Sequence, residues 1–401
     1  MSNSIDGSVN DNEHVMIKIF NSFSSNKDKF EPFEKNMVKV FICGPTLYDY
    51  THVGHARIFL TYDLLCRHLR ERGYDTDVLV NMTDINQNVF NKAKDESKDY
   101  HVVARFYAQK FAEDLNILNI KSVNRFAYVS DYVEYMESHI SQLLEQKIAY
   151  YANGNVYLDI SKDRKYGMLS KQSRNQLQLH RLDIGPNKKS QEDIMLWNCS
   201  DDFGFSWKSK FGSGIPWWHM QDTTVALENF GANYDIHGGA RELLYPHHEA
   251  HLAQYKMFST SENPVKMWMH VGLVLSNGEK MSKSLGNVVW SKDLAQKYGQ
   301  NLLRLYIFST HYREDVNFDE KQIIERRQLL QKINITGTKT SKKTDSELSV
   351  LVEAFFAALD DDLNSPKALE IFENICSKVI AGSNIGYDDF QRICQVLGIV
   401  L

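Results

Sequence analysis

The string His52-Val53-Gly54-His55 holds residue types that suit contact with a nucleotide. Gly54 has no Cβ, so the start of a helix can lie close to a ligand at this point. The N-terminal end of a helix favours anions, and the imidazoles of His52 and His55 can donate hydrogen bonds to phosphate oxygens there. Alone, such a string is more often a pair of surface histidines around a turn, so a second feature has to support a phosphate site.

A second string, Lys280-Met281-Ser282-Lys283-Ser284, lies farther along the chain. Its two lysines and two hydroxyls flank a Leu-Gly-Asn turn. This is the composition of a loop that closes over a triphosphate and neutralises charge as pyrophosphate leaves. A solvated basic loop is the alternative for this string taken alone. The two strings together predict an ATP site.

The elements around these strings predict an α/β fold with a doubly wound parallel sheet. Residues 38–43 (VKVFIC) form an apolar run that ends in a Gly-Pro turn, and residues 56–74 have apolar side chains at helical spacing. Residues 77–84 (DVLVNMTD) return as a strand. This order makes the first half of a nucleotide-binding fold, with HVGH at the strand-to-helix crossover where ligands bind. The second half resumes at residues 234–239 and continues through residues 268–275.

Composition divides the chain into four parts. Residues 1–15 are polar and are expected to form a disordered extension, and residues 16–335 hold the doubly wound core. Within the core, residues 128–215 contain short strands punctuated by Gly and Asn, which indicates an inserted subdomain. Residues 336–346 (TGTKTSKKTDS) are linker-like, and residues 347–401 have the periodicity of a helical domain.

The overall composition is that of an ordinary globular protein, with a formal net charge of -5 and 43% hydrophobic residues. This charge gives no global attraction to nucleic acid, so any such contact has to come from local basic patches. No stretch reaches the ~18 apolar residues of a membrane span, and the polar N-terminus has no signal-peptide core, so we expect a cytoplasmic protein. The five cysteines are odd in number and scattered, which is typical of free thiols in a reducing compartment.

Longer strings extend the pattern along nearly the whole chain. FICGPTLYDYTHVGHAR, NMTDIN, WWHM, DIHGGARELLYPHHE, WMHVGLVL, KMSKSLGN and LDDDLNSPKAL follow one another as in cysteinyl-tRNA synthetases. The chain therefore resembles that family of class I aminoacyl-tRNA synthetases, whose HIGH and KMSKS signatures correspond to the two strings, from about Met16 to Leu401. The resemblance implies activation of an amino acid, cysteine above all, with ATP and Mg2+ through an aminoacyl-adenylate, and transfer to tRNA.

The resemblance also assigns roles to individual residues. The expected catalytic residues are the histidines and lysines of the two signatures: His52, His55, Lys280 and Lys283. ATP binding is expected from these four residues together with Gly54, Gly238, Gly239, His270, Met281, Ser282 and Ser284. The amino-acid pocket is expected to include Thr46, Thr83 and Trp218. Core packing explains Thr83 equally well, and a tight turn alone explains the two glycines at 238 and 239.

The predicted metal position is where the sequence departs from the family. Family members hold a zinc ion with two cysteines, a histidine and a glutamate, and the zinc binds the substrate thiolate. The corresponding residues here are Cys43, Asp222, His247 and His251, of which Cys43 and His247 match. Carboxylate and imidazole both bind zinc, and the two histidines are one helical turn apart, so we expect a zinc site of altered composition. A site that has lost its metal is the alternative.

The sequence leaves the acceptor of the activated amino acid open. The chain ends soon after LDDDLNSPKAL, so we expect it to lack the small anticodon-reading domain of longer synthetases. A ligase for a small-molecule or carrier acceptor, similar to the mycothiol-pathway cysteine ligase, is the second hypothesis, and a non-catalytic binding paralogue is the third. We expect a monomer. A tRNA acceptor requires phosphate contacts from basic residues that follow KMSKS. The alternative is that these residues only lie on solvated helix faces. They are Arg304, His311, Arg313, Arg326, Arg327, Lys339, Lys342 and Lys343.

Overall fold

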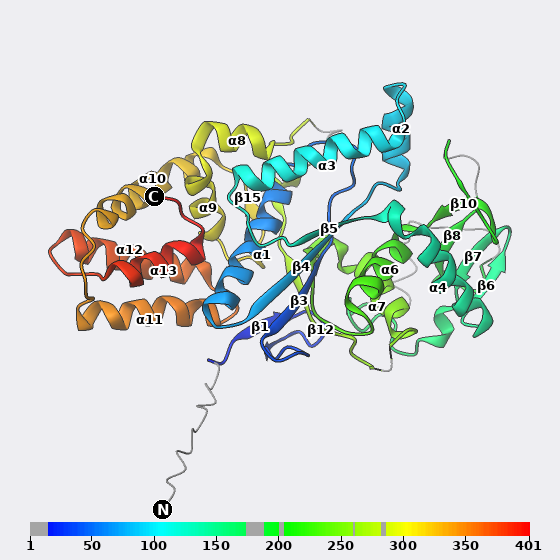
Figure 1. Cartoon of the computed structure of the whole chain (residues 1–401), viewed down its shortest axis with the longest axis horizontal. Helices are drawn as coiled ribbons and strands as arrows, with labels where there is room; N and C mark the ends of the chain where they lie inside the picture. The colour runs from blue at the N-terminus through cyan, green and yellow to red at the C-terminus, as the bar shows by residue number, and fades with distance from the viewer. Residues whose placement is uncertain (1–14, 174–187, 200–203, 260, 282–285) are drawn as a thin grey trace, which may run out of the picture.

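The computed structural model describes residues 15–173, 188–199, 204–259, 261–281 and 286–401. In Figure 1 a central parallel sheet lies between a group of C-terminal helices and an inserted subdomain. The expected disordered extension lies outside the described residues, apart from Val15.

The central sheet has five parallel strands in the order β12-β11-β3-β4-β5. They span Val265–Val271 (β12), Tyr234–Ala240 (β11), Met37–Ile42 (β3), Asp75–Met82 (β4) and Arg125–Tyr128 (β5). Within this sheet the first strand in the sequence is β3, and β4 and β5 are added on one side of it. The chain then crosses back and adds β11 and β12 on the other side of β3. This reversal confirms the predicted doubly wound sheet. It places a switch point between β3 and β11, where such folds bind ligands.

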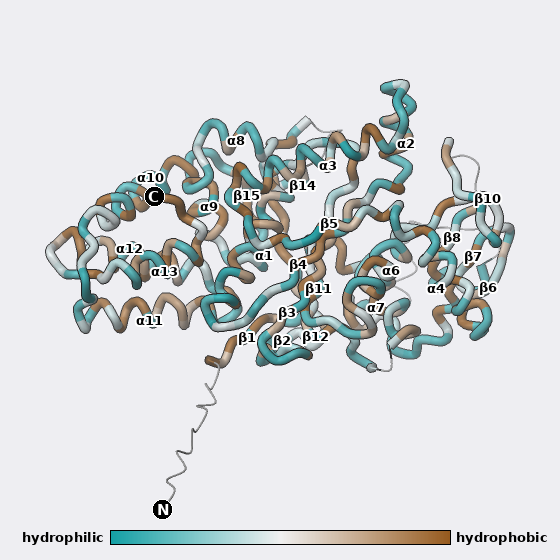
Figure 2. Tube along the Cα trace, in the orientation of Figure 1, coloured by the Kyte–Doolittle hydropathy of each residue, from teal (hydrophilic) through white to brown (hydrophobic). Residues whose placement is uncertain are grey.

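The inner strands are apolar on both faces because two separate cores cover them. Val40 and Ile42 of β3 belong to the core that contains the apolar side of α1, whereas Phe41 packs with Val225 and Leu252 from α6 and α7. These helices span Val53–Glu71 (α1), Trp218–Phe230 (α6) and His247–Lys256 (α7). Hydrophobic residues run through the central strands in Figure 2, whereas α2 (Gln87–Asp95) is mostly hydrophilic. Among the described residues, no helix is both long and apolar enough to cross a lipid bilayer.

The chain between β5 and α6 forms the inserted subdomain. It contains the 3-10 turn η1 (Val129–Tyr132), α4 (Val133–Glu145) and an antiparallel sheet in the order β6-β7-β8-β10-β9. In chain order, its strands β6 to β10 span Ala149–Ala152, Asn155–Leu158, Ile194–Asn198, Trp207–Ser209 and Gly212–Pro216. A second 3-10 turn, η2 (Ile160–Lys162), follows β7.

Two small sheets extend the core. The hairpin of β1 (Lys18–Asn21) and β2 (Asn26–Lys29) lies beside β12. Strand β13 (Val274–Ser276) pairs with β14 (Glu279–Lys280) and with β15 (Val316–Asn317), and so leads the chain into the second signature string.

Helices make up the C-terminal part of the chain. They are α8 (Ser291–Tyr298), α9 (Gln300–Phe308), α10 (Glu320–Gly337), α11 (Ser346–Asp360), α12 (Ser365–Ile380) and α13 (Tyr387–Leu397), and the longer α3 (Tyr100–Ile117) contacts α8 from the core. The segment predicted as a linker, 336–346, includes the last two residues of α10 and the first residue of α11. Thr336 is fully buried, and Ser341 forms an isolated bridge with Gly386, so this connection packs against the helices.

Arg304 of the predicted basic patch is an interior residue. It is fully buried in α9 and donates to Asp63 of α1 (2.6 Å) and to the carbonyl of Leu397 (2.6 Å). The prediction that it contacts phosphate at the surface is therefore wrong, because a long-range carboxylate partner neutralises its charge inside the protein. Other members of the patch do lie on the surface: Arg327, Lys339, Lys342 and Lys343.

Candidate active site

The imidazole of His52 caps the start of α1. His52 Nδ1 accepts from the backbone N–H of Gly54 (3.1 Å), and His55 Nδ1 accepts from the backbone N–H of His52 (3.3 Å), which makes a reciprocal capping box. A ring nitrogen that accepts a hydrogen bond carries no proton, so both rings carry their proton on Nε2 and donate from there. A Cβ at position 54 would lie 2.8 Å from the His52 ring, so glycine is required for this cap.

Backbone contacts join the cap to the segment that follows the second string. His52 forms an isolated β-bridge with Trp290. The backbone N–H of Val53 donates to the carbonyl of Val289 (2.9 Å). The structure therefore places HVGH beside the segment that follows the second string, although the two are far apart in the sequence.

Lys280 and Met281 are the described residues of the second string. Lys280 is exposed, and its ammonium group forms an ion pair with Glu242 in the 3-10 turn η4 (Arg241–Leu244). Met281 is buried. The other predicted residues of this string lie outside the described residues: Ser282, Lys283 and Ser284.

The carboxyl ends of β3 and β4 bring Thr46 and Thr83 together. The two residues form an isolated parallel bridge, and the backbone N–H of Leu47 donates to the carbonyl of Thr83 (3.0 Å). The hydroxyl of Thr83 also accepts from the side chain of Asn81 (3.2 Å). Both threonines therefore lie at the edge of the sheet where the switch point is.

Three of the four predicted metal ligands meet at the end of β3. Cys43 Sγ lies 3.3 Å from Asp222 Oδ2, and the same oxygen lies 2.8 Å from His247 Nε2. The three ligand atoms lie within 4.8 Å of one another, and a thiol, a carboxylate and an imidazole are all zinc donors, so these residues fit a zinc ion. Trp218 stacks on His247 with ring centroids 4.2 Å apart, which places this predicted pocket residue beside the cluster.

The fourth predicted ligand, His251, lies one turn farther along α7. Its Nε2 is 2.9 Å from the hydroxyl of Tyr234, and its Nδ1 is 3.2 Å from the hydroxyl of Thr223. Both ring nitrogens therefore have hydrogen-bond partners in the protein. The structure does not bring His251 into contact with the other three predicted ligands among the groups that it describes.

Two histidines that the sequence analysis did not select also lie beside Cys43. His237 Nε2 and His248 Nε2 are 3.5 Å and 3.2 Å from Cys43 Sγ, and the three residues form a second possible metal group. His248 Nδ1 lies 2.8 Å from His270 Nε2, and His270 Nδ1 lies 2.7 Å from the hydroxyl of Ser22. His270, predicted to bind ATP, thus has both ring nitrogens engaged in this network. In the sequence, the adjacent histidines of YPHHE and the histidine of DIHGG could have indicated that His248 and His237 belong to this site.

Burial keeps His237, His248, His251 and His270 neutral. It lowers the pKa of His251 and of His270 to about 3. Burial, followed by the neighbouring imidazoles, also lowers the pKa of His237 and His248 well below the usual range. Burial raises the pKa of the Cys43 thiol. Neutral imidazole is the form that binds a metal, so the histidines are ready to act as ligands, whereas the thiol has to lose its proton.

The two predicted ATP-binding glycines lie against a side chain of α1. A Cβ at Gly238 would lie 2.0 Å from the hydroxyl of Tyr62, so this position admits only glycine. The Tyr62 hydroxyl accepts from the backbone N–H of Gly239 (3.1 Å) and donates to the carbonyl of Met269 (2.7 Å). Close packing of α1 on the sheet therefore explains glycine at 238.

Arg57, two residues after His55 in α1, has a structural role. Its guanidinium group is buried and donates to the carbonyls of Gly272 (3.2 Å), Leu273 (2.9 Å), His311 (3.0 Å) and Glu314 (2.5 Å). Burial lowers its pKa to about 10, which still leaves it charged at neutral pH. It fastens the loop around β13 to α1.

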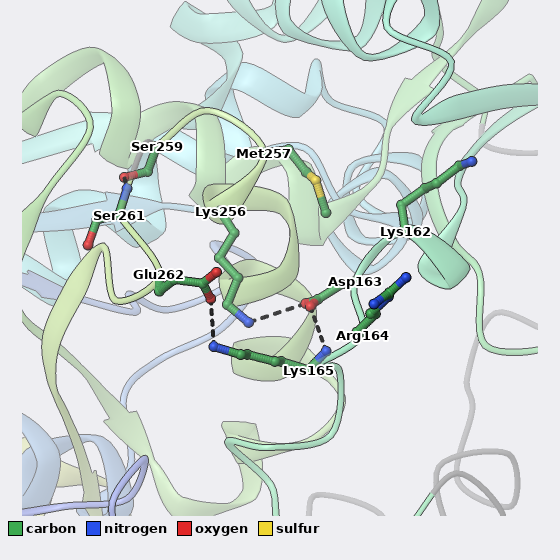
Figure 3. Close-up of a pocket in the computed structure, with 9 residues that line it drawn as sticks. All are labelled: Lys162, Asp163, Arg164, Lys165, Lys256, Met257, Ser259, Ser261 and Glu262. Atoms are coloured by element: carbon green, nitrogen blue, oxygen red, sulfur yellow. Dashed lines mark hydrogen bonds and ion pairs between the residues drawn. The ribbon is translucent and has the colours of Figure 1, made fainter.

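A cavity of about 380 Å³ at the opposite end of α7 is separate from this site (Figure 3). Two of its lysines form ion pairs, Lys256 with Asp163 (3.3 Å) and Lys165 with Glu262 (2.8 Å). The C-terminal end of a helix repels anions, so this end of α7 is a poor place for a phosphate. The candidate site lies at the other end of α7, where His247 begins the helix.

Comparison with solved structures identifies the class of the fold. The chain is similar to Mycobacterium tuberculosis methionyl-tRNA synthetase in complex with methionyl-adenylate, with a TM-score of 0.65 and 15% identity over 90% of this chain and 88% of that one. It is also similar to the LeuRS-tRNA-LeuAMS complex of Agrobacterium radiobacter, with a TM-score of 0.68 and 11% identity over 92% and 84% of the two chains. The model of the class I (C) tRNA synthetase catalytic domain matches residues 29–328. The chain is a class I aminoacyl-tRNA synthetase.

Curated relatives narrow this class. The cysteine–tRNA ligase of Thermococcus onnurineus is 33% identical over 377 residues, which cover 90% of this chain and 79% of the relative. That of Oceanobacillus iheyensis is 34% identical over 397 residues, which cover 96% and 84%. The chain belongs to the cysteinyl-tRNA synthetase family, as the sequence resemblance predicted.

Proposed function

We propose that this chain is a cysteine–tRNA ligase, which forms cysteinyl-adenylate from cysteine and ATP and then transfers the cysteinyl group to tRNA. The proposal rests on the position of the metal-ligand cluster next to the start of α1. The cluster of Cys43, Asp222 and His247 lies at the end of β3, and the crossover that follows leads into the capped start of α1. Donors for a thiol-binding metal and donors for phosphate thus share one switch point, which is what activation of a thiol amino acid requires.

The first step needs positioning and charge neutralisation more than a protein nucleophile. The carboxylate of cysteine attacks the α-phosphorus of ATP, and pyrophosphate leaves. His52 and His55 donate from Nε2 to the phosphate oxygens, at the positive end of α1. Lys280 and Lys283 neutralise the leaving pyrophosphate, and Lys280 exchanges Glu242 for phosphate when ATP is bound. Mg2+ accompanies ATP, as it does for transferred phosphates generally.

The amino-acid pocket selects cysteine by its sulfur. Cys43, Asp222 and His247 would hold a zinc ion, which when bound binds the substrate thiol and separates cysteine from serine far better than a small apolar pocket does. Trp218 stacks on His247 and lies beside the bound amino acid. Thr46 and Thr83 line the same edge of the sheet.

The second step takes place with tRNA as the acceptor, and we place it in the cytoplasm. The doubly wound part, 16–335, carries both chemical steps, and the helices of 347–401 support the RNA. Surface cations of the helical region supply phosphate contacts: Arg327, Lys339, Lys342 and Lys343.

The test is ATP–pyrophosphate exchange with each amino acid in turn, followed by charging of total tRNA with the amino acid that exchanges. We expect exchange with cysteine alone and charging of a cysteine-accepting tRNA. Exchange with cysteine and no charged tRNA would identify a small-molecule or carrier acceptor instead. No exchange with any amino acid would refute the adenylation chemistry.

A further inference from the structure

The two carboxylate oxygens of Asp222 have different surroundings. Oδ2 faces the cluster, 3.3 Å from Cys43 Sγ and 2.8 Å from His247 Nε2. Oδ1 instead accepts a hydrogen bond from Asn81 Nδ2 at 2.7 Å. Asp222 and Asn81 are both buried, with exposures of 3% and 2%, so this contact is shielded from water and is correspondingly strong.

The side-chain amide of Asn81 is held in one orientation. Its Oδ1 accepts from the backbone N–H of Gly44 (2.6 Å), and its Nδ2 also donates to the hydroxyl of Thr83 (3.2 Å). A flipped amide would place its NH2 group against the N–H of Gly44 and its oxygen against the carboxylate of Asp222, so the network excludes it. Gly44 is itself required, because a Cβ there would lie 1.7 Å from the backbone oxygen of Asn81.

We infer that Asn81 is a positioning residue that fixes the carboxylate of Asp222, so that Oδ2 is the oxygen directed at the metal. The inference rests on the zinc ion of the proposed function. A carboxylate has two equivalent oxygens and can turn about its Cβ–Cγ bond, and a hydrogen bond to one oxygen removes that freedom. A thiolate at position 222 would have a single ligand atom and would not need this support. We expect the contribution of Asn81 to zinc binding to depend on the carboxylate at position 222.

The experiment is a double-mutant cycle on zinc affinity, measured by competition with a chromophoric chelator in the absence of ATP, cysteine and tRNA. Asn81→Leu removes the donor at nearly constant volume. We expect the zinc dissociation constant to rise ~10–100-fold, the usual effect of losing the partner of a metal ligand. In an Asp222→Cys background, the same change should alter the dissociation constant by no more than about two-fold, as for independent sites. Asn81→Leu also removes the acceptor of the Gly44 backbone N–H, and the Asp222→Cys background measures how much this second loss alone changes the zinc affinity.

Asn124→Ala is the matched control. Like Asn81, Asn124 accepts a hydrogen bond from a backbone N–H, here that of Val78 (2.8 Å). Val78 lies nearer the start of β4 than Asn81 does. We expect its zinc affinity to equal that of the wild type. If Asn81→Leu does not fold, as judged by its circular dichroism, Asn81→Ala takes its place in the same cycle, with the same expected dependence on the residue at 222.

The possible failures are distinguishable. A wild-type protein that binds no zinc would refute the metal site of the proposed function, and the role of Asn81 with it. A wild-type protein that binds zinc, but loses the same affinity on Asn81→Leu in both backgrounds, would overturn the role of Asn81 alone. No loss of affinity with Asp222 present would overturn it as well. Co2+ gives a second readout, because its absorption spectrum should change with Asn81→Leu and stay constant with Asn124→Ala.

Discussion

His52 combines two roles that one substitution can separate. Its Nδ1 caps α1 through the backbone N–H of Gly54, and its Nε2–H is the proposed donor to ATP. Asparagine is among the best N-cap residues but has no second ring nitrogen, so His52→Asn keeps the cap and removes the donor. We expect adenylate formation to slow by ~100–1,000-fold, the effect of losing one donor to the transition state. The free energy of unfolding should change by less than about 0.5 kcal/mol.

Two further variants bracket this result. His52→Ala removes the donor and the cap together, so it should show the same kinetic loss and also lower the free energy of unfolding by about 1 kcal/mol. Asp319→Ala removes a cap at another helix, since Asp319 caps α10 by accepting from the backbone N–H of Lys321 (2.9 Å). It should lower the free energy of unfolding by a similar ~1 kcal/mol and leave adenylate formation unchanged.

Single-turnover formation of cysteinyl-adenylate and urea unfolding provide the two measurements. The single-turnover rate isolates the chemical step from tRNA charging and product release. An adenylate rate for His52→Asn within a few-fold of the wild type would show that His52 is only a helix cap. A stability loss in His52→Asn as large as in His52→Ala would show that the imidazole contributes more to folding than its cap geometry suggests.

Three further predictions concern the pocket, the helical region and pH. Asp222→Cys replaces a hard metal ligand with a soft one. In pyrophosphate exchange it should raise the preference for cysteine over serine by on the order of ten-fold. An unchanged ratio of cysteine to serine exchange would place Asp222 outside the metal's ligands. Arg304→Ala removes one arginine partner of the buried Asp63, which keeps Arg67 (2.7 Å), and should lower the free energy of urea unfolding by about 1.5–3 kcal/mol, the loss of a hydrogen bond to a charged group. Arg327→Glu should instead spare stability and weaken tRNA binding in a salt-dependent manner, and equal stability of the two variants would contradict this. Burial lowers the pKa of His251 and His270 to about 3 from the ordinary 6.5, so the unfolded state binds more protons. Each histidine should then reduce the free energy of unfolding by about 1.4 kcal/mol for each pH unit between 6.5 and about 3, and a flat pH profile over this range would refute this.

The crossover around HVGH could be predicted because neighbours in the sequence decide it. An apolar strand, a Gly-Pro turn and a helix with apolar residues at helical spacing are all local patterns. The return of the chain at YDIHGG then identified the doubly wound order. The role of Gly238 was not predictable in the same way, since the side chain that requires glycine there, Tyr62, belongs to a distant helix.

The composition of the histidine cluster depends on side-chain directions that spacing alone does not supply. His247 and His251 are one helical turn apart, which suggested a shared ligand role, yet His251 reaches Tyr234 while His247 reaches Asp222. His248 follows His247 directly, and the change of direction of about 100° between consecutive helix positions points it at Cys43 Sγ (3.2 Å) instead of Asp222. Sheet and helix have to be placed together before these contacts can be known.

Arg304 illustrates the same limit for charge. It was grouped with surface cations because it follows the second signature string, but it lies within the apolar run LLRLYIF. A cation in such a run is buried and needs a partner, and its partner here, Asp63, comes from the middle of α1. The apolar context was the sequence signal for burial, whereas the identity of the partner required the fold.

Helix α1 joins the site of activation to the region proposed to hold tRNA. Its first turn carries the donors of HVGH, and its last turns bind the C-terminal helices. Asp360 accepts from His68 Nε2 (2.8 Å) and from Arg72 Nε (2.9 Å), and Arg67 donates to the carbonyl of Gln395 (2.9 Å). A continuous helix is stiff along its axis, so the helical region and the phosphate donors keep a constant relative position. Transfer requires this, because the acceptor hydroxyl has to meet the adenylate in a fixed geometry.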